Sequence, residues 1–209
     1  MTEKNLSFVS RETNYYLLEY LKFLEKWNRR INLVSKASIK NAWDRHIVDS
    51  AQLWPFIENG NHKKWVDIGS GAGFPGLVIA AIAAEKRPNL SMVLVDSDKK
   101  KCVFMREAAR VLRVSVKIIS GRIEKLDSLG ADVLSARALA PFPDLVKYSK
   151  LHRVEGGKSL FLKGENEYQE ILKLKETEEL DLQFFPSLTQ EKSFIVCLGS
   201  HSGVISNGS

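Results

Sequence analysis

Residues 65–76, WVDIGSGAGFPG, constrain the fold of this 209-residue chain more than any other segment. An apolar, strand-like run leads into Gly69, Gly71 and Gly73, and Pro75 then stands where a helix would begin, a position at which its missing N–H costs nothing. Glycines let the backbone turn sharply and let a ligand lie against it without a Cβ in the way. A strand, a glycine turn and a helix in this order predict an α/β sheet with a ligand at the carboxyl end of the strand.

The rest of the chain alternates between strand-like and helical patterns, as such a sheet requires. Apolar residues at helical spacing predict an amphipathic helix at 12–31. After a polar connection, a second helical stretch is expected at about 41–54 and should stop at Pro55. Short β-branched or apolar runs predict five strands, at 64–68, 91–95, 115–119, 131–135 and 159–162. Helical patterns follow or separate them, at 75–85, 99–112, 143–152 and 165–179, with a turn at 124–129.

Near-continuous apolar strands alternating with helices predict a parallel sheet that is covered on both faces. Two further strand-like runs, 180–185 and 193–198, flank a turn at Pro186 and predict an antiparallel edge hairpin. The expected fold class is therefore α/β, a Rossmann-like and mostly parallel seven-stranded sheet. We expect one structural unit made of a helical cap, a core and a disordered Gly/Ser-rich tail, at 1–60, 61–199 and 200–209.

The spacing within the glycine loop selects among ligands. A dinucleotide fingerprint would place its third glycine at position 74, which is Phe74, and the GK-Ser/Thr signature of a phosphate-cradling loop is not present. Asp67 stands two residues before the first glycine, and Asp96 ends the second strand, where a carboxylate can bind both hydroxyls of a ribose. A ligand with a ribose and no required phosphate contact fits best, which favours S-adenosylmethionine (SAM). The alternative is a tight turn without a ligand.

Two later segments follow strands three and four and point to the same edge of the sheet. Ile123 and Glu124 could grip an adenine face and its amino group, and Arg137 follows the fourth strand beside the reacting methyl. Both residues also have an interpretation without a ligand: Glu124 is an acid of the kind favoured at a helix N-terminus, and Arg137 could be a surface cation.

Composition limits the possible function classes. With 44% hydrophobic and 27% charged residues the chain is neither disordered nor collagenous, and Cys102 and Cys197 are expected to be buried small hydrophobes. The longest apolar run, 76–84, falls short of the roughly 20 residues that span a bilayer, and no charged-then-apolar leader opens the chain. We therefore expect a cytoplasmic protein that binds no metal and no membrane.

Charge is unevenly distributed along the chain. The net charge is +6, but residues 96–125 hold nine Lys/Arg against four Asp/Glu, whereas residues 155–191 hold four against nine. A basic face attracts polyanions because phosphate contacts release counterions. The charge pattern permits a nucleic-acid partner without requiring one, because lysines are also common on the solvent-exposed face of any helix.

Several short motifs occur together and in a fixed order: Lys26-Trp27-Asn28 with Asn32-Leu33, Arg45-His46-Ile47-Val48-Asp49-Ser50, DIGSGAGFPG, Leu94-Val95-Asp96-Ser97, Ser135-Ala136-Arg137-Ala138 and Leu162-Lys163-Gly164. Together they resemble the GidB/RsmG family, bacterial methyltransferases that modify guanine N7 in 16S ribosomal RNA. The resemblance spans roughly residues 17–199 and implies a SAM-dependent Rossmann-like fold with an N-terminal helical cap. Ala136 separates Ser135 from Arg137, where some relatives read Ser-Arg directly.

The resemblance and the loop together give the candidate site. Cofactor contacts are expected at Gly69, Gly71, Gly73, Phe74, Asp96, Ser97, Ile123, Glu124 and Arg137. RNA contacts are expected at Arg45, His46, Lys163, Lys99 and Lys100, with Lys101, Arg106, Arg110 and Arg113 as a further phosphate-binding surface. His46 could equally be a packed histidine that orients the cap, and Arg45 could pair with Asp49. Trp27 and Trp54 are expected in the core, and the family suggests a monomer.

The chemistry that the family implies needs no general base. Guanine N7 is already a lone-pair nucleophile, so the enzyme has only to align it with the methyl and the sulfur, and Arg137 is the expected positioning residue. The chain contains neither an Asp/Asn-Pro-Pro-Tyr/Phe run nor a Pro-Cys loop, which disfavours exocyclic-amine and pyrimidine-C5 methyltransferases. A small-molecule methyltransferase and a catalytically silent SAM- and RNA-binding module stay open as alternatives.

Overall fold

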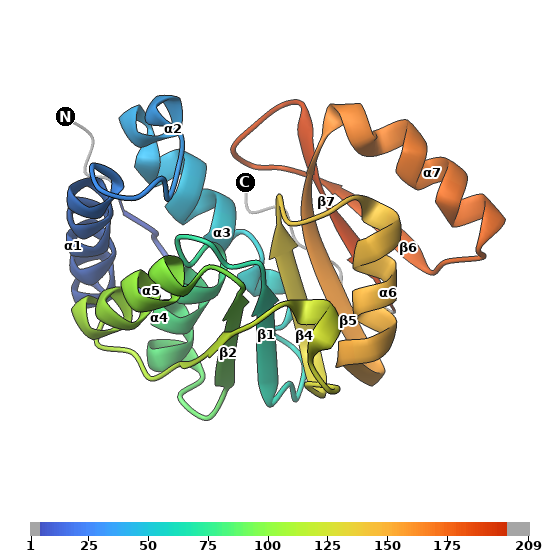
Figure 1. Cartoon of the computed structure of the whole chain (residues 1–209), viewed down its shortest axis with the longest axis horizontal. Helices are drawn as coiled ribbons and strands as arrows, with labels where there is room; N and C mark the ends of the chain where they lie inside the picture. The colour runs from blue at the N-terminus through green and yellow to red at the C-terminus, as the bar shows by residue number, and fades with distance from the viewer. Residues whose placement is uncertain (1–4, 200–209) are drawn as a thin grey trace.

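The computed structural model describes residues 5–199, in which one mixed sheet carries the fold (Figure 1). The strands are β1 (Lys64–Ile68), β2 (Ser91–Asp96), β3 (Lys117–Ser120), β4 (Ala131–Arg137), β5 (Arg153–Gly164), β6 (Leu182–Pro186) and β7 (Ser193–Leu198). Their order is β3-β2-β1-β4-β5-β7-β6; the first five are parallel, and β7 is antiparallel to both of its neighbours. The expected seven-stranded α/β sheet with a closing hairpin is confirmed.

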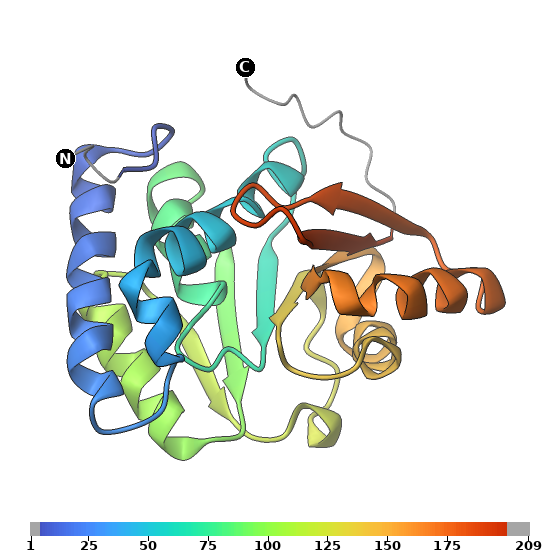
Figure 2. The same cartoon turned by 90° about the horizontal axis from the view of Figure 1, so that it is seen from above.

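Helices cover both faces of the sheet. Before β1 lie α1 (Arg11–Asn28), α2 (Lys36–Lys40), the π-helical η1 (Trp43–Val48), α3 (Asp49–Ala51) and the 3-10 turn η2 (Trp54–Phe56). The later helices are α4 (Gly76–Lys86), α5 (Lys99–Val111), α6 (Phe142–His152) and α7 (Tyr168–Thr177), with 3-10 turns η3 (Ile123–Lys125) and η4 (Glu165–Glu167). Figures 1 and 2 show α1, α4 and α5 on one side of the sheet and α6 with α7 on the other.

Strand residues alternate between two apolar clusters because successive side chains point to opposite faces. Trp65, Leu94 and Val133 pack with α1, α4 and α5, whereas Val66, Val93 and Leu134 pack with α6. Both faces of the central strands are therefore buried, which explains their near-continuous apolar sequence. Cys102 and Cys197 are buried in the first cluster, as expected.

The N-terminal helices do not follow the expected boundaries. α1 ends at Asn28, three residues before the expected end, because the Asn28 side chain accepts hydrogen bonds from the backbone N–H of Leu33 (2.8 Å) and Val34 (2.9 Å) and so closes a turn. The helical stretch expected at 41–54 is present, but it begins as the π-helical η1, which continues into α3. The expected end at Pro55 is wrong, because Pro55 lies inside η2. The short helix α2 was not expected.

Smaller differences occur in the second half of the chain. β3 begins two residues later than expected, and β5 is longer than the expected 159–162, since it continues through a register shift opposite β4. The expected turn at Pro186 is also misplaced. Pro186 is the last residue of β6 and pairs with Phe194, so residues 187–192 form the connection to β7.

The N-terminal helices pack against the sheet domain through apolar side chains. Leu17, Tyr20 and Leu24 of α1 are buried, and Phe104 of α5 stacks on Phe23 with ring centroids 5.6 Å apart. Trp54 is buried and Trp27 is half-buried against the same cluster. The division into a cap and a core stays a prediction, and the expected tail, 200–209, lies outside the described residues.

No helix within residues 5–199 is both long and apolar enough to cross a membrane.

Candidate active site

Two neighbouring hollows open where the parallel strands end. The first, which we call the loop pocket, has a volume of about 360 Å³ and is lined by residues that include Gly69, Asp96, Ser97, Ile123 and Glu124. The second, the cap pocket, has a volume of about 390 Å³ and is lined by residues that include Arg45, His46, Asp49, Arg137 and Lys163. Ala138 lines both pockets. The strand ends therefore place two adjoining binding spaces at the edge where ligands of open α/β sheets bind.

The glycine loop is anchored from two directions. Gly69, Gly71 and Gly73 all have positive φ (65°, 57° and 88°), a conformation that side chains with a Cβ rarely adopt. From α1, the buried hydroxyl of Tyr20 donates a hydrogen bond to the backbone carbonyl of Ala72. The loop is thus attached to a helix that lies 52 residues earlier in the chain.

Asp67 has a structural position rather than a place in the loop pocket. It is fully buried; its Oδ1 accepts a hydrogen bond from Ser135 Oγ (2.6 Å) and its Oδ2 accepts one from the Gly76 backbone N–H (3.2 Å). Burial raises the pKa of Asp67 to about 6, although its hydrogen bonds act in the opposite direction. This carboxyl joins β1 to β4 and to the first residue of α4.

Asp96 is placed as a ribose ligand should be. One carboxylate oxygen accepts from the Gly71 N–H (2.7 Å) and the other from the Asp98 N–H (2.8 Å), which fixes the plane of the group at the wall of the loop pocket. Each carboxylate oxygen has two lone pairs, so both can still accept from a ligand hydroxyl. The Asp96 carboxylate therefore fits a ribose as an acceptor for its hydroxyls, without any need for a phosphate.

The structure brings five of the nine expected cofactor residues together in the loop pocket: Gly69, Asp96, Ser97, Ile123 and Glu124. Gly71 supports Asp96 from behind, and Gly73 lies against Leu77 and Tyr20. Phe74 and Arg137 face the cap instead.

Lys101 and Tyr148 also line the loop pocket. Sequence reasoning treated Lys101 as a phosphate contact and missed Tyr148, which comes from α6 and carries no local motif.

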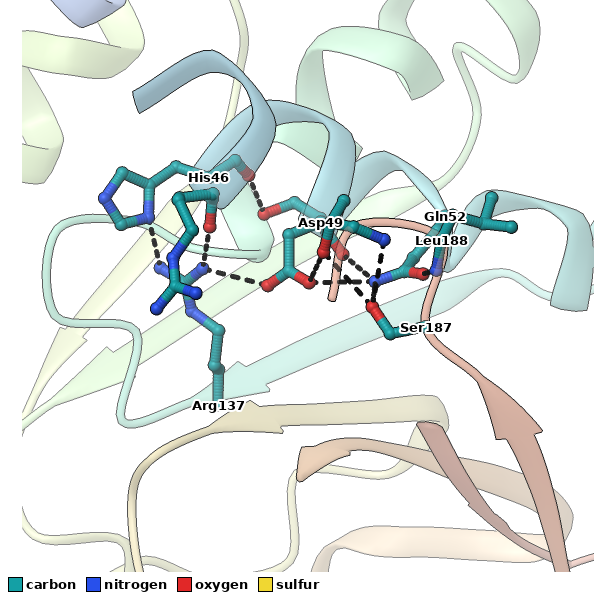
Figure 3. Close-up of polar contacts among 9 residues, drawn as sticks. His46, Asp49, Gln52, Arg137, Ser187 and Leu188 are labelled. Atoms are coloured by element: carbon teal, nitrogen blue, oxygen red, sulfur yellow. Dashed lines mark hydrogen bonds and ion pairs between the residues drawn. The ribbon is translucent and has the colours of Figure 1, made fainter. Parts of the chain in front are cut away.

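Arg137 lines the cap pocket and contacts several other residues of its wall (Figure 3). Its Nη1 donates to the Arg45 carbonyl (3.0 Å) and to Asp49 Oδ2 (3.2 Å), and its Nη2 lies 3.1 Å from His46 Nδ1. The guanidinium also lies 5.0 Å from the centre of the Phe74 ring, on which the His46 ring stacks at 4.7 Å. Asp49 thus pairs with Arg137 and not with Arg45, contrary to the alternative considered from the sequence.

His46 is held as a neutral ring that accepts a hydrogen bond. Burial, together with the positive charges of Arg137 and Arg45, lowers its pKa to about 3. Because a guanidinium can only donate, Nδ1 must accept from Arg137, and the ring proton therefore resides on Nε2. This geometry matches the alternative raised in the sequence analysis, a packed histidine that orients the cap. His46 also lines the cap pocket.

The other basic residues expected to contact RNA differ in their exposure: one is buried and three are exposed. Lys163 is only 3% exposed, and its ammonium donates to Glu167 (2.6 Å) and to the Ala140 carbonyl (3.0 Å) at the wall of the cap pocket. Lys99 and Lys100 are exposed on the first turn of α5, and Arg45 is exposed beside the cap pocket. Only the exposed group is free to approach a polyanion without breaking an ion pair.

Comparison with known proteins gives the family. The model of the GidB family, described as rRNA small subunit methyltransferase G, matches residues 13–196. The chain belongs to this family. Proteins named ribosomal RNA small subunit methyltransferase G from Cereibacter sphaeroides and Paramagnetospirillum magneticum are 40% and 44% identical to it; the alignments cover 91% and 92% of this chain and 92% and 91% of those proteins. The resemblance drawn from the sequence motifs is confirmed.

Solved structures show that this GidB-family chain has a methyltransferase fold. It resembles an O-methyltransferase from Bacillus cereus in complex with SAH (TM-score 0.59, 15% identity, 93% of this chain and 94% of that one). It also resembles the O-methyltransferase TomG from Streptomyces achromogenes in complex with SAM (TM-score 0.60, 13% identity, 93% and 92%). Family and fold together make the chain a SAM-dependent methyltransferase.

Proposed function

We propose that this GidB-family protein transfers a methyl group from SAM to N7 of a guanine in the 16S RNA of the small ribosomal subunit. The observation that carries the proposal is the junction of the two pockets at Ala138: a pocket suited to a ribose adjoins a second pocket lined by Arg45, His46 and Arg137. The names of the relatives support ribosomal RNA as the substrate.

The chain's residues can perform this reaction by positioning alone. Bound SAM supplies an electrophilic methyl on a sulfonium; the N7 lone pair forms the new bond while the electrons of the S–CH₃ bond return to sulfur. No proton leaves the purine, so no general base is needed. Asp96 would hold the ribose, Ile123 and Glu124 the adenine, and Arg137 would orient the guanine for in-line attack.

His46 suits a reaction whose product is a cation. The methylated purine carries the positive charge that the sulfonium loses, and a charged histidine next to it would oppose that transfer. With its pKa lowered to about 3, the His46 ring adds no charge at neutral pH. Arg137 already supplies one positive charge, and Asp49 balances it at 3.2 Å.

We assign the RNA contacts to those basic side chains that are exposed to solvent. Arg45, Lys99 and Lys100 are the proposed phosphate contacts, whereas Lys163, with its ammonium bound to Glu167, shapes the wall of the cap pocket. A ribosomal substrate puts the proposed reaction in the cytoplasm. We also propose, from the family resemblance, that the protein acts as a monomer.

The experiment is incubation with methyl-labelled SAM and 30S subunits or 16S RNA from cells that lack the activity, followed by nucleoside mass spectrometry. We expect labelled 7-methylguanosine with the wild-type protein and far less with Asp96→Ala at a SAM concentration that only just saturates the wild type. Bound SAM without any labelled nucleoside would reject the proposal and favour a silent binding module or a small-molecule enzyme. A labelled nucleoside other than 7-methylguanosine would keep the RNA substrate and reject N7.

A further inference from the structure

Gln52 belongs to a buried polar cluster that also contains Asp49 and Arg137, but Gln52 itself lies in none of the family motifs and has no part in the proposed chemistry (Figure 3). Only 7% of the residue is exposed. Its Oε1 accepts a hydrogen bond from the Leu188 backbone N–H (2.8 Å), and its Nε2 donates to Asp49 Oδ1 (2.9 Å) and to the Asp49 carbonyl (3.0 Å). Ser187 Oγ lies 3.3 Å from the same nitrogen. One amide therefore joins the segment after η1 to the connection between β6 and β7.

The cluster continues from Gln52 to Arg137 through a single carboxylate. Asp49 is 4% exposed; its Oδ1 accepts from Gln52 and from Thr189 Oγ1 (2.9 Å), while its Oδ2 accepts from Arg137 (3.2 Å). Donors on both oxygens fix the plane of the carboxylate, and that plane in turn directs the guanidinium. Gln190 and Ser193, from the same connection and the start of β7, line the cap pocket.

We propose that Gln52 is a positioning residue for methyl transfer: it holds the β6–β7 connection against the cap and sets, through Asp49, the orientation of Arg137 in the cap pocket. The inference rests on the proposed function, because it assigns Gln52 to the substrate side of that reaction. An amide suits this position, since it both donates and accepts. A leucine would offer neither interaction, and a glutamate would put a second negative charge beside Asp49.

The first test compares Gln52→Leu with the wild type in single-turnover methylation of 30S subunits at saturating SAM. A misplacement of about 1 Å in a positioned group can lower a rate by about 100-fold, so we expect the rate to fall by about 10- to 100-fold. The dissociation constant of SAM should not change, since neither Gln52 nor Asp49 lines the loop pocket. Asp132→Ala is the control. Asp132 lies near the start of β4, at the end of the strand opposite to Arg137, and its Oδ2 accepts from the backbone N–H groups of Lys63 and Lys64. Its removal should leave the rate unchanged.

The second test needs neither RNA nor SAM. Arg137 donates to His46 Nδ1, so the wild-type ring should show one neutral tautomer, with the proton on Nε2, in ¹⁵N-histidine NMR spectra. If Gln52 orients Arg137, Gln52→Leu should give a mixture of tautomers and a higher His46 pKa, whereas Asp132→Ala should give the wild-type spectrum. A loss of stability alone would not produce this signature in the folded protein.

The outcomes separate this inference from the proposed function. If the wild type does not methylate 30S subunits, the proposed function fails, and the NMR measurement still reports on Gln52. If the wild type is active, an unchanged rate or an unchanged His46 spectrum in Gln52→Leu overturns the inference. Should Gln52→Leu not fold, Thr189→Val takes its place, because it removes the other donor to Asp49 Oδ1 from a half-buried loop position; the same two results are expected.

Discussion

The hydroxyl of Tyr20, on the first helix, donates a hydrogen bond to the backbone carbonyl of Ala72 in the glycine loop. Tyr20 is fully buried, so Tyr20→Phe leaves that carbonyl without its partner at a cost of about 1–3 kcal/mol. We expect the melting temperature to fall by about 2–4 °C per kcal/mol and SAM to bind more weakly, because the loop is less well held. Thermal denaturation and calorimetric titration measure the two effects.

Tyr16→Phe is the matched control on the same helix. Its hydroxyl bonds to Glu12 at the surface (3.2 Å), so its removal should change neither stability nor SAM affinity. Equal behaviour of the two variants would show that the hydrogen bond from α1 to the loop does not support the cofactor site.

Asp96 and Asp98 are separated by one residue and should behave differently when replaced by alanine. Asp96→Ala removes the carboxylate at the wall of the loop pocket, and the loss of even one charged hydrogen bond, worth about 1.5–3 kcal/mol, weakens SAM binding by about 10- to 150-fold. Asp98 caps α5 through the N–H groups of Lys100 and Lys101, so Asp98→Ala should cost about 1 kcal/mol of stability and leave SAM binding intact. Comparable SAM affinities in titrations of the two variants would rule out the ribose role.

Arg137→Ala should abolish methyl transfer in a protein that still folds and binds SAM, because the guanidinium lines the cap pocket. Arg87→Ala, which removes bonds to the carbonyls of Gly60 and Glu58 away from both pockets, is the control for replacing an arginine. Labelled methyl incorporation into 30S subunits is the measurement. Unchanged turnover in Arg137→Ala would refute its positioning role.

His46 should make the folded protein less stable in acid. Its pKa is about 3 in the folded state against an ordinary value of 6.5, so between these pH values the unfolded chain binds more protons and the free energy of unfolding falls as the pH falls. Asp67 opposes this trend, since its raised pKa makes the folded state bind more protons between pH 3.8 and about 6.

The difference between the wild type and His46→Gln isolates the histidine, because Asp67 is common to both. From pH 6.5 to pH 4, urea denaturation should show the wild type losing about 3 kcal/mol more than the variant. Parallel pH profiles for the two proteins would mean that His46 titrates normally.

The exposed lysines at the start of α5 should contribute to RNA binding through charge alone. Replacing Lys99 and Lys100 by alanine should reduce the slope of log affinity against log salt by about 0.7–0.9 for each phosphate that is no longer neutralised. Lys147 and Lys150, exposed on α6 across the sheet, provide the control pair. A salt slope that both double variants change equally would show that net charge, and not the α5 surface, determines the affinity.

The parts of the site that sequence could predict are local. The glycine loop, Asp96, Ile123 and Glu124 each follow directly after a strand, and the topology of a parallel sheet brings strand ends together whatever the loops between them do. Helical periodicity likewise found α1 and α4 to α6 to within a few residues. At 41–54 it indicated helix but not the kind of helix, because the apolar spacing of a π-helix and short helical turns is indistinguishable from that of one longer helix.

The cap pocket could not be predicted because its contacts are distant in sequence. Asp49 bonds to Thr189, 140 residues later, and Arg137 lies 88 residues after Asp49. The sequence contains the motif with Arg45, His46 and Asp49, but its spacing allows an Arg45–Asp49 pair within one helix and gives no sign of Arg137. The role of Asp67 is likewise invisible in the sequence: it stands two residues before the first glycine, but its burial and its bonds to Ser135 and Gly76 give it a structural role.

Ala138, the residue common to the two pockets, has a thermodynamic consequence. A methyl side chain on a backbone with φ of 53° forms part of the wall of both binding spaces, and Arg137 precedes it directly in the chain. In the proposed function, cofactor and RNA would both contact this short stretch of backbone. If one ligand changes the affinity of the other by some factor, the second must change the affinity of the first by the same factor. An RNA that binds more tightly when SAM is present must hold SAM more tightly by the same factor.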